Sequence, residues 1–486
     1  MTGTGIDDLR DCVSKGLEAT KKDGVEIEVF ASWNELVTMR INYTSDIPSM
    51  GLQEPKSNQS FGVGVQAAFT DKGKVTVGFG SESNNLHPRA VREAFRKARR
   101  CRLSDPDFHS LPSPAGTPTL SDYHDPAAME VQDADVVELG WKALKGALEA
   151  YKERGITKSI IVGGDVCILK EKMAIKSTMG IEEFDESTIL TATITTMVED
   201  EDVKGTGWST STHLEGFDPE AAGREAAESA IRTTGGERIE PGAYEVVFGR
   251  QPVTDLVSHI IAPSLSLSYV NASNTPFLGK LGKEICSSNL SIYDHGALPG
   301  QVASKKITCE GLPTGRTDLV SNGLLVGFLA NHYLSQKLSG PAAAFEPRNG
   351  FRFHAVGRNN DMRAAISPTN IVVEGREEVS SEELLSGIRE GLYIGRIWYT
   401  YPINGMAAGD FTSTIIADSF LIKDGKLSTP LKPNTIRINS NISHILNNVR
   451  SVTKEKKATL VWAAEEAVIA PEIRVTGVRL DGIATA

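Results

Sequence analysis

The segment TILTATITTMVED, residues 188–200, decides the fold class of the first half of this 486-residue chain. Threonines at 191, 193 and 195 alternate with apolar residues at 190, 192 and 194, so an extended backbone would place apolar side chains on one face and hydroxyls on the other. Strands with one solvated face are typical of antiparallel sheets, because parallel strands are covered on both faces. The segment therefore predicts an antiparallel sheet.

The same plan of elements appears twice in the first half of the chain. Each copy starts and ends with an amphipathic helix, and the expected helices are 5–22, 87–101, 135–152 and 218–234. Four strand-like runs lie between each pair, at 25–31, 35–44, 61–70 and 74–83, and at 159–171, 172–178, 188–200 and 204–212. Pro88 and Pro219 suit the first position of the closing helices, and Asp218 can cap the second of them.

We therefore predict an α+β protein whose N-terminal domain, 1–236, contains two α-β-β-β-β-α-like units with antiparallel sheet. The units cover about 1–103 and 134–234, and the Pro-, Ser- and Asp-rich stretch 103–126 connects them irregularly. Gly235-Gly236 ends a helix and Pro241-Gly242 makes a turn, which marks a second boundary. Many short strand-like runs follow, so residues 237–486 are predicted to form a β-rich domain that is barrel-like or sandwich-like.

Composition excludes several classes of protein. The net charge of −11 disfavours a nucleic-acid or anionic-membrane partner, which would need a clustered positive surface. The five cysteines are widely spaced and odd in number, as expected for reduced thiols. The first residues lack the apolar core of a signal peptide, and no apolar run is long enough to span a bilayer. We expect a cytoplasmic protein that binds neither nucleic acid nor membrane.

Residue chemistry alone gives no complete catalytic constellation. The stretch 252–267 has helical spacing and carries one histidine, His259, one turn after Asp255. A helix supplies two zinc ligands only when two histidines lie about one turn apart, so His259 alone is more often a partly buried helix histidine than a ligand. Asp410, which precedes Phe411, follows a glycine and suits turn chemistry better than acid catalysis.

Six stretches together resemble the TldD/PmbA family, the modulators-of-gyrase peptidases. Their order and spacing match over nearly the whole chain, and they are FGVGVQAAFTDKGKVTVGFGSES (61–83), AYEVVFGRQPVTDLVSHI (243–260), CEGLPTGRTDLVSNGLLVGFLANHYLSQKLSG (309–340), TNIVVEGREEVSSEELLSGIREGLYI (369–394), GDFTSTIIADSFLIKDGKLSTPLKPNTIRI (409–438) and NISHILNNVRSV (441–452). The resemblance implies an N-terminal α+β domain, a C-terminal β-rich domain, and pairing of a TldD-type subunit with a TldE (PmbA)-type subunit.

The resemblance also implies where zinc would bind, because only the TldD-type subunit carries an HExxxH helix and a later cysteine as ligands. This sequence has TDLVSHI, residues 254–260, at the position of that helix, and no cysteine follows Cys309. Without three ligands and a base, a chain cannot activate water through zinc. We therefore expect no catalytic residue, no metal ligand and no cofactor in this chain, with zinc in a partner.

Two hypotheses follow. In the first, the chain is a TldE-like subunit of a heteromeric zinc peptidase and completes the peptide-binding chamber of an HExxxH-bearing TldD-like partner, and Asp255, His259, Asp410 and Phe411 are its possible substrate-groove or partner-site residues. In the second, it acts without zinc as a binding or scaffold protein, or in a small-molecule or peptide biosynthetic pathway. A homodimer is possible if no partner exists.

Overall fold

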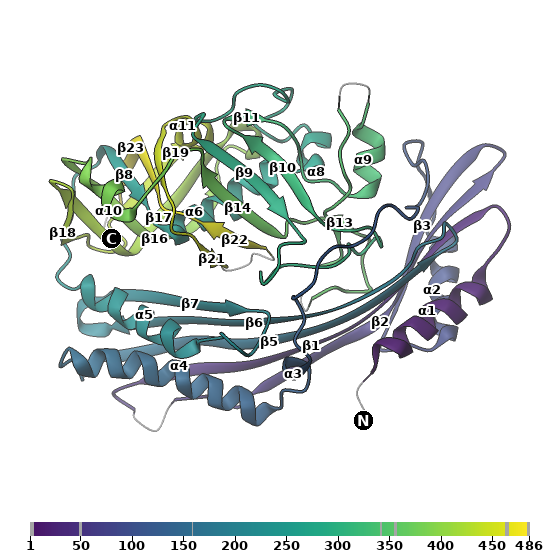
Figure 1. Cartoon of the computed structure of the whole chain (residues 1–486), viewed down its shortest axis with the longest axis horizontal. Helices are drawn as coiled ribbons and strands as arrows, with labels where there is room; N and C mark the ends of the chain where they lie inside the picture. The colour runs from purple at the N-terminus through teal and green to yellow at the C-terminus, as the bar shows by residue number, and fades with distance from the viewer. Residues whose placement is uncertain are drawn as a thin grey trace.

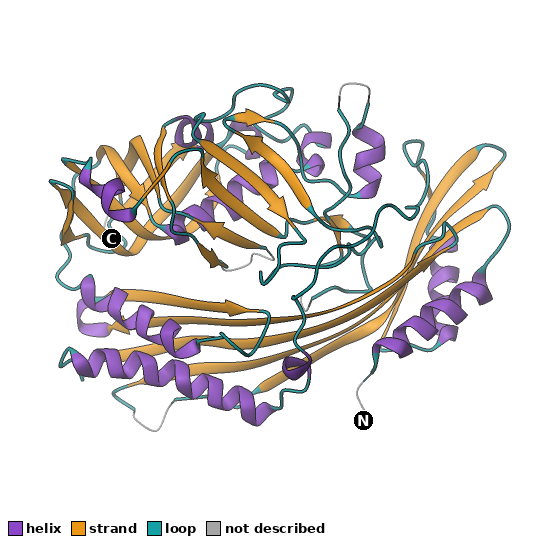
Figure 2. Cartoon of the chain, viewed as in Figure 1, coloured by secondary structure: helices purple, strands orange, loops and turns teal. Residues whose placement is uncertain are grey.

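The computed structural model describes residues 4–47, 51–157, 159–340, 343–353, 357–461 and 466–483. A long curved sheet from the first half of the chain carries the β-rich second half on its concave face (Figure 1). Helices lie against the opposite face of this sheet (Figure 2). The sheet therefore forms the middle layer, and both of its faces are covered.

The strand β6 (Glu182–Val198) contains the alternating segment that predicted the sheet. Its even-numbered side chains from Thr188 to Val198 are buried, and the odd-numbered ones are half-buried or exposed. The sheet order is β4-β3-β2-β1-β5-β6-β7, and each neighbouring pair is antiparallel. The prediction of an antiparallel sheet is confirmed. The other strands are β1 (Val25–Thr44), β2 (Lys56–Asp71), β3 (Lys74–Ser83), β4 (Leu103–Ser104), β5 (Ile160–Ser177) and β7 (Val203–Ser211).

Each unit has three long strands between its helices rather than the four that we predicted. The runs 25–31 and 35–44 are one strand, β1, and the runs 159–171 and 172–178 are one strand, β5. β1 and β5 pair without a register shift from Glu28 to Thr44. The polar residues that suggested a break, such as Asn34, are buried under the second half of the chain. These polar residues therefore mark the part of the strand that the second half covers, and they do not mark a turn.

Two helix pairs cover the outer face of the sheet. The first pair packs on Ile27 and Val29 of β1, and the second packs on Val37 and Met39 farther along the same strand. Asp218 accepts a hydrogen bond from the backbone of Ala221 at 2.9 Å, so its predicted cap is confirmed. The helices are α1 (Ile6–Thr20) and α2 (Pro88–Arg100), then α4 (Asp133–Glu153) and α5 (Pro219–Arg232), and the short α3 (Pro126–Met129) precedes α4.

Five strands of the second half close into a barrel. β8 (Gly242–Phe248) pairs in parallel with β16 (Glu390–Pro402) and antiparallel with β23 (Ile473–Gly482), and β17 (Asp410–Lys423) and β19 (Ile436–Asn441) complete the ring. A second sheet has the order β11-β10-β9-β14-β22-β21 and shares one hydrophobic core with the barrel. The predicted α+β class with a β-rich, barrel-like C-terminal half is confirmed.

The remaining elements of the second half are short. The strands of the second sheet are β9 (Leu290–His295), β10 (Arg316–Ser321), β11 (Leu324–Leu325), β14 (Asn370–Gly375), β21 (Lys457–Thr459) and β22 (Ala467–Ala470). The other strands and helices are β12 (Gly350–Phe351), β13 (Ala365–Ile366), β15 (Glu378–Val379), β18 (Lys426–Pro430), β20 (Val449–Thr453), α8 (Leu267–Asn271), α9 (His332–Leu338), α10 (Ser381–Ser386) and α11 (Ile442–Asn447).

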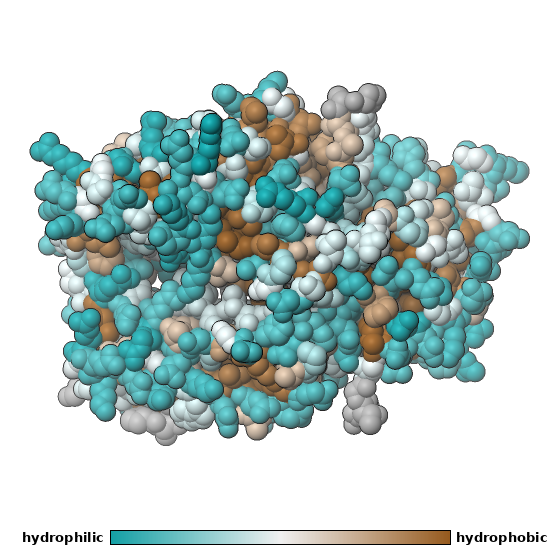
Figure 3. All heavy atoms as spheres, viewed as in Figure 1, coloured by the Kyte–Doolittle hydropathy of each residue, from teal (hydrophilic) through white to brown (hydrophobic). Residues whose placement is uncertain are grey.

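The two halves meet through a mixed apolar and polar surface. Phe30 of β1 and Ile175 of β5 pack against Ile307 and Phe351 from the second half. Polar residues dominate the face of the molecule shown in Figure 3, and hydrophobic residues reach it in separate patches. Within the ranges described above, no helix combines the length and the apolar character needed to cross a membrane.

Candidate functional site

The helix that carries His259 changes its winding at that histidine. α6 (Arg250–Leu256) continues into a π-helical turn, η2 (Val257–Ile261), and then into α7 (Ala262–Ser264). The predicted helix at 252–267 is thus present as three consecutive pieces. Such π-helical turns are rare and are frequent at functional sites. The π-helical turn therefore marks this segment as a candidate site.

Asp255 and His259 contact each other across one turn, as their spacing suggested. The His259 Nδ1 atom lies 3.4 Å from Asp255 Oδ1 and 3.0 Å from the backbone carbonyl oxygen of Asp255. The hydrogen bond and charge of Asp255 raise the pKa of His259. The Asp255 side chain is 6% exposed and that of His259 is 29% exposed, so only the imidazole reaches solvent.

Two residues from the barrel complete this polar cluster. The Thr400 hydroxyl of β16 donates to Asp255 Oδ2, and Thr400 Oγ1 lies 2.7 Å from Ser413 Oγ of β17. Nearby, burial lowers the pKa of Arg396 to about 10, although the negative charge of Asp255 acts in the opposite direction. Asp255 is therefore held by a hydroxyl, an imidazole and the field of a guanidinium, which fixes its carboxylate in place.

Asp410 and Phe411 belong to different surroundings from Asp255. Asp410 accepts hydrogen bonds from Asn441 Nδ2 at 2.9 Å and Asn404 Nδ2 at 3.2 Å, and these bonds lower its pKa. This turn-stabilising network agrees with the turn chemistry expected from its sequence. Phe411 is 0% exposed in the barrel core. Its role in a groove or partner site stays a prediction, and in this structure its side chain presents no surface to solvent.

An exposed aromatic segment flanks Thr400, and sequence reasoning missed it. Trp398, Tyr399 and Tyr401 are 44%, 64% and 52% exposed. The rings of Trp398 and Tyr399 stack at 5.2 Å between centroids, and the pairing of β16 with β17 shifts register between Trp398 and Tyr401. Tyr399 has φ of +57°, which an aromatic residue rarely adopts. The available signal was the aromatic density of IWYTY, residues 397–401.

The donor set of this cluster does not fit a zinc ion. A protein zinc site uses at least three nitrogen, sulfur or oxygen ligands that converge. Across the part of the chain that the structure describes, no group of three or more His, Cys, Asp or Glu side chains is arranged to hold a metal. The helix itself presents Thr254, Asp255 and His259. No hydrolytic step through a metal can be assigned to these residues.

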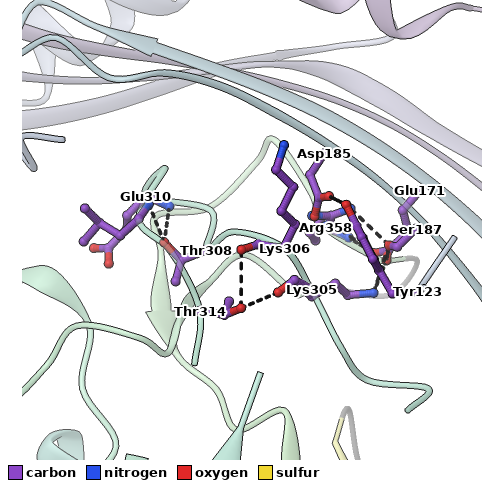
Figure 4. Close-up of polar contacts among 11 residues, drawn as sticks. Tyr123, Glu171, Asp185, Ser187, Lys305, Lys306, Thr308, Glu310, Thr314 and Arg358 are labelled. Atoms are coloured by element: carbon purple, nitrogen blue, oxygen red, sulfur yellow. Dashed lines mark hydrogen bonds and ion pairs between the residues drawn. The ribbon is translucent and has the colours of Figure 1, made fainter. Parts of the chain in front are cut away.

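A second polar cluster, buried between the two halves of the chain, was also missed by sequence reasoning (Figure 4). Glu171 of β5 accepts hydrogen bonds from Lys305 Nζ at 2.5 Å, from Ser187 Oγ at 2.6 Å and from the Arg358 backbone at 2.9 Å. Arg358 Nη1 also donates to Asp185 Oδ2 at 2.6 Å. The four charged side chains are 2% exposed or less, so we name Glu171, Asp185, Lys305 and Arg358 the interdomain ion cluster.

The charges of the interdomain ion cluster compensate one another. Burial alone would raise the pKa of Glu171, but the charges of Lys305 and Arg358 lower it to about 2. Burial lowers the pKa of Lys305, against the attraction of Glu171. Two acidic and two basic side chains are thus buried together, and their formal charges cancel. Their partners come from β5 and β6 on one side and from loops of the second half on the other, which ties the two halves together.

Comparison with known proteins relates the second half to a peptidase family. Residues 241–482 match the family described as PmbA/TldA metallopeptidase C-terminal domain. Metalloprotease PmbA of Escherichia coli O157:H7 is 23% identical over 53% of this chain and 51% of its own length. An uncharacterized protein of Methanocaldococcus jannaschii is 23% identical over 86% of this chain and 90% of its own length.

Solved structures share the fold of the whole chain. The structure of TldE from Thermococcus kodakarensis has a TM-score of 0.79 and 20% sequence identity, and the match covers 98% of this chain and 100% of that one. A putative modulator of a DNA gyrase from Thermotoga maritima has a TM-score of 0.76 and 20% identity, covering 97% and 99%. At this identity, the comparison establishes a common fold for both halves.

Proposed function

Because residues 241–482 belong to the PmbA/TldD family, we propose that this chain is the TldE-like subunit, without a zinc site, of a heteromeric zinc peptidase. The observation that carries the proposal is the π-helical turn at the position of the zinc helix. The turn itself carries His259, and α6, which precedes it, carries Thr254 and Asp255, so the segment lacks the two histidines and the glutamate of HExxxH. The structural likeness to a TldE supports the same assignment of subunit type. Zinc and the catalytic base would then belong to an HExxxH-bearing partner.

The roles of this chain's own residues follow from their contacts. Asp255 is buried and fixed by Thr400 and His259, so it would position the helix and β16 rather than accept a proton from water. The exposed rings of Trp398 and Tyr399 extend from the same strand and would supply an apolar surface to the partner or to the peptide in the chamber. An extended peptide in such a chamber gains affinity from backbone hydrogen bonds.

The compartment proposed for this assembly is the cytoplasm. All five cysteines are free thiols in the structure, and three of them are buried. Reduced cysteines are usual where the thiol pool is reducing. The proposal predicts that the chain is functional without any disulfide.

Co-expression with an HExxxH paralogue from the same genome tests the proposed function. The chain alone should bind no stoichiometric zinc and cleave no peptide, whereas the co-purified pair should hold zinc and turn over peptides. A Trp398→Ala/Tyr399→Ala variant should weaken pairing or peptide turnover, and Tyr293→Ala, on β9, serves as an aromatic control.

Two results would refute this function. One is zinc bound at about one ion per isolated chain and lost on His259→Ala. The other is a stable homo-oligomer that neither associates with nor activates any HExxxH paralogue. The second result would favour the metal-independent alternative, a binding or scaffold protein or a member of a biosynthetic pathway.

A further inference from the structure

A small cavity lies between the N-terminal sheet and the second half of the chain, and the proposed function does not use it. Its volume is about 300 Å³. Its walls come from β1, β2 and β3, from the connection after β4, and from the start of α9. None of the residues of the helix at 250–264 or of the interdomain ion cluster lines it. The cavity is therefore separate from both polar clusters described above.

Glu310 contributes a buried carboxyl group to the wall of this cavity. The residue is 7% exposed, and its carboxylate accepts one hydrogen bond among the described residues, from the His332 backbone at 3.0 Å. Burial raises the pKa of Glu310 to about 8. By contrast, the other buried acid of the wall, Glu28, is ion-paired with Arg352. Among the described residues, no ion pair joins Glu310 to a cation, and a buried carboxyl of this kind gains most from a cationic ligand.

Arg363 contributes the complementary charge. Its guanidinium forms no hydrogen bond or ion pair with any residue that the structure describes, and it lines the same cavity. Burial lowers the pKa of Arg363, while the negative charge of Asp105 acts in the opposite direction. Asp105 is itself engaged, because it accepts a hydrogen bond from the Tyr333 hydroxyl at 3.2 Å. A guanidinium with free donors is suited to bind a carboxylate through two parallel hydrogen bonds.

We propose that this cavity binds a small zwitterion, an α-amino acid or a dipeptide, with its ammonium group on Glu310 and its carboxylate on Arg363. The apolar part of the wall, which includes Val77, Phe108 and Leu111, would receive an aliphatic side chain. A volume of about 300 Å³ holds about ten groups the size of a water molecule and lies at the lower end of small-molecule sites. This size excludes longer peptides and nucleotides.

The ionisation of Glu310 on binding would release a proton, and this release can be measured. The charges of Glu28, on β1, and of Arg352, which follows β12, both act on Glu310. The neutral His332, whose Nε2 donates to the Ser110 carbonyl at 3.1 Å, lies beside it at the start of α9. Burial raises the pKa of Glu310 to about 8, so its carboxyl group would be mostly protonated at pH 7 before a ligand binds. An ammonium ligand favours the ionised form, so binding at pH 7 should release close to one proton.

Isothermal titration calorimetry on the full chain, without any partner, tests this site. The probes are L-leucine, the dipeptide glycyl-leucine, isopentylamine as the amine without a carboxylate, and 4-methylpentanoate as the acid without an amine. A zwitterion should bind with a Kd of about 1 mM or tighter and at least about tenfold more tightly than either analogue. Titrations in two buffers of different ionisation enthalpy should report the proton released.

Variants distinguish the two ends of the ligand. Glu310→Gln should weaken zwitterion binding about tenfold or more and abolish proton release, and Arg363→Gln should weaken binding similarly while leaving proton release unchanged. Arg389→Gln, an exposed arginine outside the cavity, is the control and should bind like the wild type. Because Arg363 is at the surface, its variant reports binding even if Glu310→Gln folds poorly. No binding of either zwitterion at 10 mM, equal binding of the single-charge analogues, or unchanged affinity of Arg363→Gln would overturn the proposal.

Discussion

Replacement of Lys305 by methionine should destabilise the fold strongly, because it leaves a net negative charge in the interdomain ion cluster. Lys305 is 2% exposed and donates to Glu171 at 2.5 Å and to Ser187 at 3.0 Å. Removing one partner of a buried ion pair costs about 3–5 kcal/mol. The charge of Lys305 is the first of the causes that lower the pKa of Glu171 against its burial, and Arg358 adds to it, so Lys305 supplies part of the stabilisation of this carboxylate.

The neighbouring lysine offers a matched control. Lys306 is half-buried, and its ammonium lies 5.1 Å from the ring centroid of Phe184, outside the interdomain ion cluster (Figure 4). Lys306→Met should therefore cost about 1 kcal/mol or less. Equilibrium urea unfolding, followed by circular dichroism and tryptophan fluorescence, measures both variants. Coincidence of the two signals would show whether the halves unfold together.

A double-mutant cycle separates the ion pair from packing. Glu171→Gln alone leaves two positive charges, Lys305 and Arg358, opposite the single negative charge of Asp185. The double variant Glu171→Gln/Lys305→Met leaves only the neutral Arg358–Asp185 pair. The double variant should therefore be less destabilised than the sum of the two single changes by more than about 1 kcal/mol. Strictly additive costs, or a Lys305→Met cost equal to that of Lys306→Met, would refute the reasoning.

Three further predictions concern separate parts of the molecule. Asp255→Asn should lower the pKa of His259 in an NMR titration, and an unchanged titration would contradict the contact. Because the pKa of His259 is raised in the folded wild type, the contact should stabilise the fold fully below about pH 6.5, and this stabilisation should disappear as the pH rises through the folded pKa. Gly223→Ala should cost roughly 1–3 kcal/mol in thermal or urea unfolding, because its Cβ would lie 1.9 Å from the Ala143 carbonyl oxygen. Gly340→Ala is the control: its Cβ would meet no atom of the described residues within 4 Å, so the change should be near neutral. Limited proteolysis should cut first in the exposed parts of the connections, 113–121 or 235–240. It should not cut first at Leu111, whose backbone N–H donates a hydrogen bond to Glu26. Early cuts within 370–394 would mean that the predicted domain boundary at 236/237 is wrong.

Local patterns predicted the parts of the fold that depend on local physics. Alternation in 188–198 predicted an antiparallel strand, and the prolines and Asp218 predicted helix starts, because periodicity and capping act over a few residues. The break predicted after Ala31 was wrong, since Ser32 and Asn34 are polar but buried. Their burial depends on the second half of the chain, which the strand's own sequence does not encode.

In the candidate sites, too, contacts set by local spacing could be predicted from the sequence, and contacts set by the tertiary fold could not. The contact between Asp255 and His259 follows from helical spacing, and it was visible in the sequence. Thr400 and Ser413 join them only because β16 and β17 pass beside the helix. Likewise, Lys305 and Glu171 are 134 residues apart in sequence, and no spacing rule links them. Partners of this kind become apparent only when the tertiary arrangement is known.

The closure of the barrel by β8 and β23 has a consequence for synthesis on the ribosome. β8 begins at Gly242, but one of its two neighbours, β23, ends at Gly482, so the nascent chain cannot complete the ring until nearly all of the second half has emerged. The N-terminal sheet has all its strands by Ser211 and can assemble while translation continues. Glu171 and Asp185 of that sheet lack their partners Lys305 and Arg358 until the second half has been synthesised, so the burial of these charges must wait for that half.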